Sequence, residues 1–108
     1  MLHDLVYQIV EEICWDRDYL YRCFTEVFSE LMNGIYRQGC SRAGGNLVVN
    51  GVKSDVEARI SWRLQHQLDY FGPNALKLEF EIRKKPSGLM VRTGDAVFDL
   101  ATGCDVGD

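Results

Sequence analysis

The chain has 108 residues, of which 26% are charged, and a net charge of −4. This length corresponds to about one domain that can bury a core without metal or disulfide support. The acidic balance argues against nucleic acid or an anionic membrane as a partner, because either would require a basic surface. No apolar run approaches the roughly 20 residues that cross a bilayer, and the amino terminus, with His3 and Asp4, lacks a signal-peptide pattern.

The four cysteines are Cys14, Cys23, Cys40 and Cys104. None of them has a partner at the spacing of two to four residues that is typical of zinc knuckles and redox motifs. Cys14 and Cys23 fall within a helical pattern, where free cysteine behaves as a small apolar residue. We therefore predict reduced thiols rather than a disulfide, a cytoplasmic protein, no metal and no cofactor.

The first third of the chain has the periodicity of an α-helix. A single helix over 2–32 would be roughly 45 Å long, whereas a domain of this size has a radius of gyration of about 13 Å. Either the helix breaks near Trp15–Asp18, where Asp16 or Asp18 would cap a second helix, or it continues. We favour the break, and we predict a helical end at Asn33-Gly34. The apolar positions are Leu2, Leu5, Val6, Ile9, Val10, Ile13, Leu20, Phe24, Val27, Phe28, Leu31 and Met32.

The stretch 56–68 alternates strictly between apolar and polar residues, which predicts one long strand with a buried face and a solvated face. The sequence Asn50-Gly51 before it is typical of a two-residue hairpin turn. That turn would pair Val49 with Val52 and Leu47 with Ser54. We expect the bend or bulge of the long strand at Lys53–Asp55.

A second connection should lie at Asp69–Asn74, which contains Gly72-Pro73. With its centre at Phe71, it sets Leu64 opposite Leu78 and Trp62 opposite Phe80. On the solvated face, the same register sets Arg63 opposite Glu79, with Arg59 diagonal to Glu81. Charge and burial agree on this register, and we predict it for that reason.

Two further turns complete the predicted sheet. Lys85–Gly88 fits a type I turn and would pair Ile82 with Val91 and Phe80 with Thr93. Gly94-Asp95 fits a two-residue turn that begins a fifth strand.

The predicted fold class is α+β. Two consecutive helices, or one long bent helix, pack on a curved antiparallel β-meander of four to five strands. We predict a single domain over 1–108, with a helical part over 1–33, a sheet over 45–101 and a frayed tail over 102–108. We place Trp62, Phe80 and Phe98 in the core.

No catalytic motif is present in the sequence. His66 is the one residue that departs from the pattern, because it lies on the apolar face near the end of the long strand. With Asp69, Tyr70 and Asp95 nearby, it is a candidate for a general acid or base. The alternative is a histidine at the edge of the core, hydrogen-bonded to the backbone or to Asp69.

The solvated face of the sheet carries dense mixed charge, which is typical of a surface in contact with water. Apolar Val48, Met90 and Val97 project from the same face beside the arginines, Arg92 among them, so a partner could also bind there. We expect a homodimer, formed through this face, an edge strand or the helices.

Our first functional hypothesis is a small non-enzymatic binding or interaction module, which forms a homodimer. The alternative is a small-molecule-binding protein or small enzyme with a pocket between helix and curved sheet, where His66 acts as acid or base. The predicted architecture is similar to that of cystatin-like and nuclear-transport-factor-like folds, which can house such pockets. This is an analogy of architecture, and a fold does not fix a function.

Overall fold

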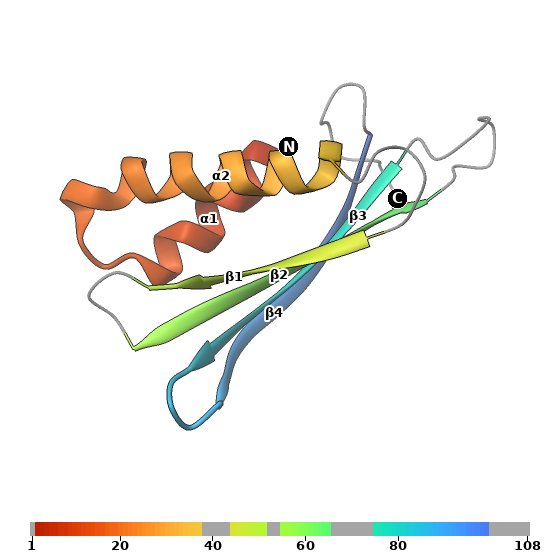
Figure 1. Cartoon of the computed structure of the whole chain (residues 1–108). Helices are drawn as coiled ribbons and strands as arrows, with labels where there is room; N and C mark the ends of the chain where they lie inside the picture. The colour runs from red at the N-terminus through yellow and green to blue at the C-terminus, as the bar shows by residue number, and fades with distance from the viewer. Residues whose placement is uncertain (1, 38–43, 52–54, 66–74, 100–108) are drawn as a thin grey trace.

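The computed structural model describes residues 2–37, 44–51, 55–65 and 75–99. Two helices precede a four-stranded antiparallel sheet in which the strands follow chain order, β1-β2-β3-β4 (Figure 1). The predicted α+β class and β-meander are therefore confirmed, with four strands. The elements are α1 (Leu2–Ile13), a short 3-10 turn (Arg17–Tyr19), α2 (Leu20–Arg37), β1 (Gly44–Asn50), β2 (Val56–Gln65), β3 (Ala75–Lys84) and β4 (Met90–Asp99).

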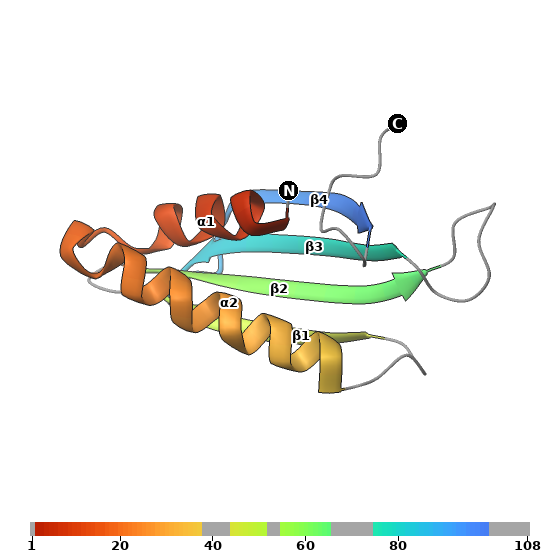
Figure 2. The same ribbon diagram turned by 90° about the horizontal axis from the view of Figure 1, so that it is seen from above.

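Both helices lie on the same side of the sheet (Figure 1). Seen from above, α2 runs over the β1 and β2 side and α1 over the β4 side (Figure 2). We call the opposite side of the sheet, which neither helix covers, the outer face. No helix in the described part of the chain is both long enough and apolar enough to cross a membrane.

The predicted break between the helices is confirmed. Helix α1 ends at Ile13, and a 3-10 turn at Arg17–Tyr19 leads directly into α2. The Asp16 carboxylate accepts a hydrogen bond from the backbone N–H of Asp18 at 3.0 Å, so Asp16 caps this turn. The corner folds the two amphipathic helices side by side, which lets both bury their apolar stripes against one sheet.

The predicted helical end at Asn33-Gly34 is wrong, because α2 continues to Arg37. Gly34 packs directly under the indole of Trp62 on β2. A Cβ atom at this position would lie 2.7 Å from Cζ2 of Trp62. This distance is too short for two carbon atoms in a packed core. Gly34 therefore provides close packing between helix and sheet within α2.

The core lies between the helices and the inner face of the sheet. Trp62, Phe80 and Phe98 are all buried there, as predicted, with exposures of 7%, 4% and 1%. The helical part contributes Leu2, Val6, Ile9, Val10, Ile13, Phe24, Val27, Leu31 and Ile35, with Cys14 just after α1, and the sheet adds Val56, Ala58, Ile60, Leu76, Leu78 and Ile82.

The predicted two-residue turn at Asn50-Gly51 is wrong. Val49 pairs with Ala58, and Leu47 pairs with Ile60, so the connection is longer than two residues. The backbone N–H of Gly51 donates to the carbonyl of Val56 at 3.0 Å. Because the shift is an even number of residues, Leu47 and Val49 remain on the inner face. The bend expected at Lys53–Asp55 falls mostly outside the described residues.

The predicted register of β2 and β3 is wrong by two residues, although the faces are right. Trp62 lies opposite Leu78, and Leu64 lies opposite Leu76. The predicted register would have placed two large rings, Trp62 and Phe80, directly opposite each other under the helices. In the structure each ring has a glycine on a neighbouring strand, with Gly45 beside Trp62 and Gly94 beside Phe80. The observed register thus avoids two large rings side by side, and it sets Arg59 directly opposite Glu81.

The connection at 85–88 joins β3 and β4 as predicted, but the predicted pairing beyond it is wrong. The backbone N–H of Gly88 donates to the carbonyl of Lys84 at 2.8 Å, so the turn is one residue wider than a type I turn. Arg83 pairs with Met90, whereas Ile82 pairs with Arg92. Val91 is therefore the extra residue of a β-bulge.

This bulge reverses the faces of the following residues. Val91 is 51% exposed, although the simple register would have buried it opposite Ile82. Arg92 instead points to the helical side, where its guanidinium lies 5.6 Å from the centre of the Phe80 ring and forms an ion pair with Glu12 of α1. The expectation that Arg92 lies on the solvated face is therefore wrong.

The turn predicted at Gly94-Asp95 is absent, and β4 runs through it without interruption. Gly94 lies opposite Phe80, and a Cβ atom there would lie 2.7 Å from Cε1 of the Phe80 ring. The glycine admits the ring rather than forming a turn. For this reason the predicted fifth strand does not begin there.

Candidate functional site

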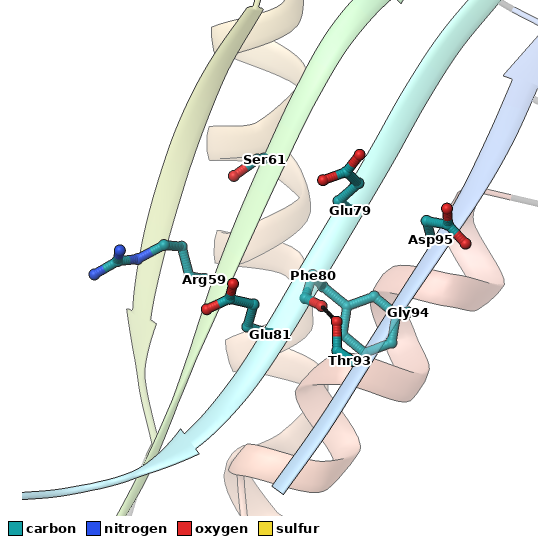
Figure 3. Close-up of a pocket in the computed structure, with 8 residues that line it drawn as sticks. All are labelled: Arg59, Ser61, Glu79, Phe80, Glu81, Thr93, Gly94 and Asp95. Carbon is teal, nitrogen blue, oxygen red and sulfur yellow. Dashed lines mark hydrogen bonds between the residues drawn. The ribbon is translucent and has the colours of Figure 1, made fainter. Parts of the chain in front are cut away.

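A hollow of about 430 Å³ lies on the outer face of the sheet, over β2, β3 and β4. We call it the outer hollow. Figure 3 shows its side chains, with the helices behind the strands. It is lined by Arg59, Ser61, Glu79, Phe80, Glu81, Thr93, Gly94 and Asp95.

Two rows of paired residues cross the outer hollow. In one row Arg59 lies opposite Glu81, which lies opposite Thr93. In the other row Ser61 lies opposite Glu79, which lies opposite Asp95. Alternation along three neighbouring strands therefore gathers these polar groups on one surface. The hydroxyl of Thr93 donates to the carbonyl of Phe80 at 3.0 Å, which fixes this side chain at the rim (Figure 3).

Charges of the same sign lie opposite each other in and beside the outer hollow. Glu79 faces Asp95 across β3 and β4, and Arg63 faces Lys77 across β2 and β3. Pairs of like charge directly opposite each other destabilise a sheet. Like charges therefore meet at two places on this face, whereas Arg59 lies opposite Glu81.

The two glutamates of the outer hollow have cations on their own strand. Lys77 Nζ lies 3.6 Å from Glu79 Oε1, and Arg83 Nε lies 3.0 Å from Glu81 Oε2. Among the described residues, no ion pair joins Asp95, Arg59 or Arg63 to an opposite charge, and all three side chains are exposed. One carboxylate and two guanidinium groups on this face thus remain open to an external partner.

Of the four predicted site residues, His66, Asp69 and Tyr70 lie outside the described residues. Asp95 is exposed on the outer face, where it lines the outer hollow. It therefore lies on the side of the sheet away from the helices, not in the space between helix and sheet.

The space between helices and sheet is well filled where the structure describes it. Val6, Val10 and Leu31 from the helices, and Ile60 and Leu78 from the sheet, are fully buried. A cavity of about 110 Å³ remains beside Cys14 and Cys23, which is below the range of about 300–1,000 Å³ for ligand pockets. The described residues contain no cluster of three potential metal ligands.

No family model, curated protein or solved structure matches this chain. The comparisons therefore add no function to the geometry of the site. A function for this chain has to be inferred from its own residues.

The sequence contained a signal for the outer hollow that the predicted registers obscured. In three pairs the polar residues are two positions apart: Arg59/Ser61 and Glu79/Glu81 alternate with apolar residues, and Thr93/Asp95 flank Gly94. In the observed registers the three pairs align side by side. The predicted turn at Gly94-Asp95 removed the third pair from this surface.

Proposed function

We propose that this chain is a non-enzymatic interaction module that forms a homodimer through the outer face of its sheet. The observation that carries the proposal is the separation of unpaired charge on that face, with Asp95 on β4 and Arg59 and Arg63 on β2. These three side chains are exposed and form no ion pair within the described residues. A second copy of the chain would supply the missing counter-charges.

The geometry of a two-fold pair is self-complementary for these groups. A two-fold axis parallel to β3 would place β4 of one copy over β2 of the other. Asp95 lies in the same row as Ser61, and Arg59 and Arg63 flank Ser61 along β2. The carboxylate would therefore lie between two guanidinium groups of the second copy, and the reciprocal contact would form by symmetry.

The area of the outer face suits a dimer of modest affinity. Four strands about 4.8 Å apart and about 30 Å long give a surface of roughly 600 Å². A standard interface buries about 800 Å² on each partner. Val48 and Met90, which are 44% and 41% exposed, supply apolar contacts around the charges. These values favour association at micromolar concentration.

The proposal also places the protein in the cytoplasm, in line with its free Cys14 and Cys23.

Reciprocal charge reversal tests the dimer. Asp95→Arg should raise the dimer dissociation constant about 100-fold, because like charges across an interface cost several kcal/mol. Arg63→Asp should have the same effect. The double variant should recover most of the wild-type affinity, because the pair is restored with its signs exchanged. Sedimentation equilibrium or light scattering measures each constant.

Arg17→Asp is the matched control, since it makes the same change of charge at an exposed position on the helical corner. It should leave the association unchanged. A wild-type chain that stays monomeric at high micromolar concentration would contradict the proposed dimer. Loss of affinity in the double variant as large as in the single variants would show that the two charges do not meet.

The outer hollow also favours a second candidate function, the binding of a small cationic ligand. Its volume is within the range of ligand pockets, and Glu79, Glu81 and Asp95 give it a negative charge. In a thermal-shift screen of metabolites, polyamines and other cations should raise the unfolding temperature, because ligand binding stabilises the native state. Glu79→Gln should abolish the shift. An equal shift in the wild-type and Glu79→Gln proteins would exclude the outer hollow as the binding site.

The role of His66 as an acid or base, in a pocket between helix and sheet, remains a separate prediction, because His66 lies outside the described residues. If a ligand is found, unchanged binding and turnover in His66→Ala would retire that role. A loss of turnover with unchanged affinity would support it.

A further inference from the structure

Two cysteine thiols meet at the corner between the helices. Cys14 directly follows α1, and Cys23 lies in the first turn of α2. The Cys14 Sγ donates a hydrogen bond to the Cys23 Sγ over 3.7 Å, and it also lies 3.4 Å from the carbonyl oxygen of Asp16. Both thiols are free. The corner thus holds two sulfur atoms in van der Waals contact across a loop of only eight intervening residues.

The surroundings leave room for the two sulfur atoms to approach. The cavity of about 110 Å³ is lined by both cysteines, together with Val10, Ile13, Val27 and Val49. Cys14 is 5% exposed, whereas Cys23 is partly exposed. A small reagent can therefore reach Cys23 first, and Cys14 is placed behind it.

We propose that Cys14 and Cys23 form a site of reversible oxidation, at which a low-molecular-weight disulfide converts the two thiols into an intramolecular disulfide between the corner and α2. The free thiols of the structure are the reduced form of this site. The inference does not depend on the proposed dimer, since the two cysteines lie on the helical side of the sheet.

The reaction balances in two exchange steps. The Cys23 thiolate attacks one sulfur of the small disulfide, which forms a mixed disulfide and releases one small thiolate. The Cys14 thiolate then attacks the Cys23 sulfur, which closes the protein disulfide and releases the second small thiolate. The two protons lost by the cysteines are taken up by the two released thiolates. Two protein thiols are oxidised, and one small disulfide is reduced to two thiols.

The environment makes the first step slow at neutral pH. Burial, then the neighbouring Cys14 and the charge of Glu26, raise the pKa of Cys23 to about 11, while Arg22 acts in the opposite direction. From β1, Val49 and Asn50 line the same cavity and carry no charge. Because the thiolate is the attacking form, the rate should increase about tenfold for each pH unit between about 7 and 10. The site responds to sustained oxidation rather than to brief exposure.

The full chain with Cys40→Ser and Cys104→Ser isolates the pair for the test. After incubation with oxidised glutathione at about pH 8.5, the unfolded protein should have lost both reactive thiols, and its mass should fall by about 2 Da without a retained glutathione. Closing this short loop restricts the unfolded chain and should raise the unfolding temperature by about 5–10 °C. Dithiothreitol should reverse all three changes.

Adding Cys23→Ser to the same background provides the matched control. This variant should show no internal disulfide and no rise in unfolding temperature. In the wild-type chain, peptide mapping should find the linkage between Cys14 and Cys23. A stable glutathione adduct, two thiols that persist after long incubation, or a wild-type linkage that involves Cys40 or Cys104 instead would overturn the proposal.

Discussion

Phe98→Ala should lower the free energy of unfolding by about 3–5 kcal/mol, the usual cost of removing a buried ring. Phe98 is 1% exposed and lies opposite Leu76 on the inner face of the sheet. Because the ring is buried in the core beside β3, the cavity left by alanine cannot collapse completely. Urea unfolding followed by circular dichroism measures the change, provided that the dependence on urea stays the same.

Two other positions on β4 serve as controls for this prediction. Val97 lies on the outer face opposite Lys77. Val97→Ala should lower the free energy of unfolding by less than about 1 kcal/mol. Val91→Ala should lower the free energy of unfolding even less, because the bulge leaves Val91 51% exposed. A cost of more than about 2 kcal/mol for Val91→Ala would mean that Val91 packs opposite Ile82 and that the bulge is absent.

Gly34→Ala should destabilise the protein by about 1–2 kcal/mol, although alanine is the better helix former. Within a helix the exchange of glycine for alanine alone gains about 1 kcal/mol. Here the new Cβ would meet Trp62 Cζ2 at 2.7 Å and Cη2 at 2.9 Å, and overpacking of this kind costs about 1–3 kcal/mol or more. The indole is 7% exposed, so little free space is available to it. The same unfolding experiment measures the effect.

Asn33→Ala is the matched control, because Asn33 is the exposed neighbour in the same turn of α2. It should stabilise the protein by a few tenths of a kcal/mol, from helix propensity alone. In a Trp62→Phe background the far ring of the indole is gone, and Gly34→Ala should become neutral or stabilising. A coupling energy near zero between the two positions would show that Gly34 and Trp62 do not touch.

Alternation along the strands was sufficient to predict which face each residue of β2 and β3 occupies. The faces survived even though the registers did not, because an error of two residues leaves the face unchanged. The exact register depended on the fit of Trp62 beside Gly45 and of Phe80 beside Gly94. Such three-dimensional packing is not visible in an alternating pattern.

Glycine misled the sequence-based prediction in two places for one physical reason. Gly34 was expected to end a helix and Gly94 to form a turn, since glycine is the residue that most often does both. In the structure each glycine lies inside a regular element and makes room for an aromatic ring. The local chain carries no signal of that contact, because the ring comes from a distant segment.

The candidate site was harder to predict than the fold. The outer hollow forms only where three strands align in the correct register, so errors in two registers removed it from view. Asp95 was selected for its expected nearness to His66, which lies outside the described residues. Asp95 itself lies among the carboxylates of the outer face. The contact between Cys14 and Cys23 depends on the angle of the helical corner, which the helical periodicity does not specify.

The order of the elements along the chain has a consequence for biosynthesis. Helices α1 and α2 precede all four strands, so a ribosome releases the helical hairpin before any part of the surface that covers it. Until the sheet has been made, the apolar stripes of both helices are exposed to solvent and to chaperones. The ion pair between Glu12 and Arg92 joins residues 80 positions apart. It can form only after β1, β2, β3 and the start of β4 have been translated.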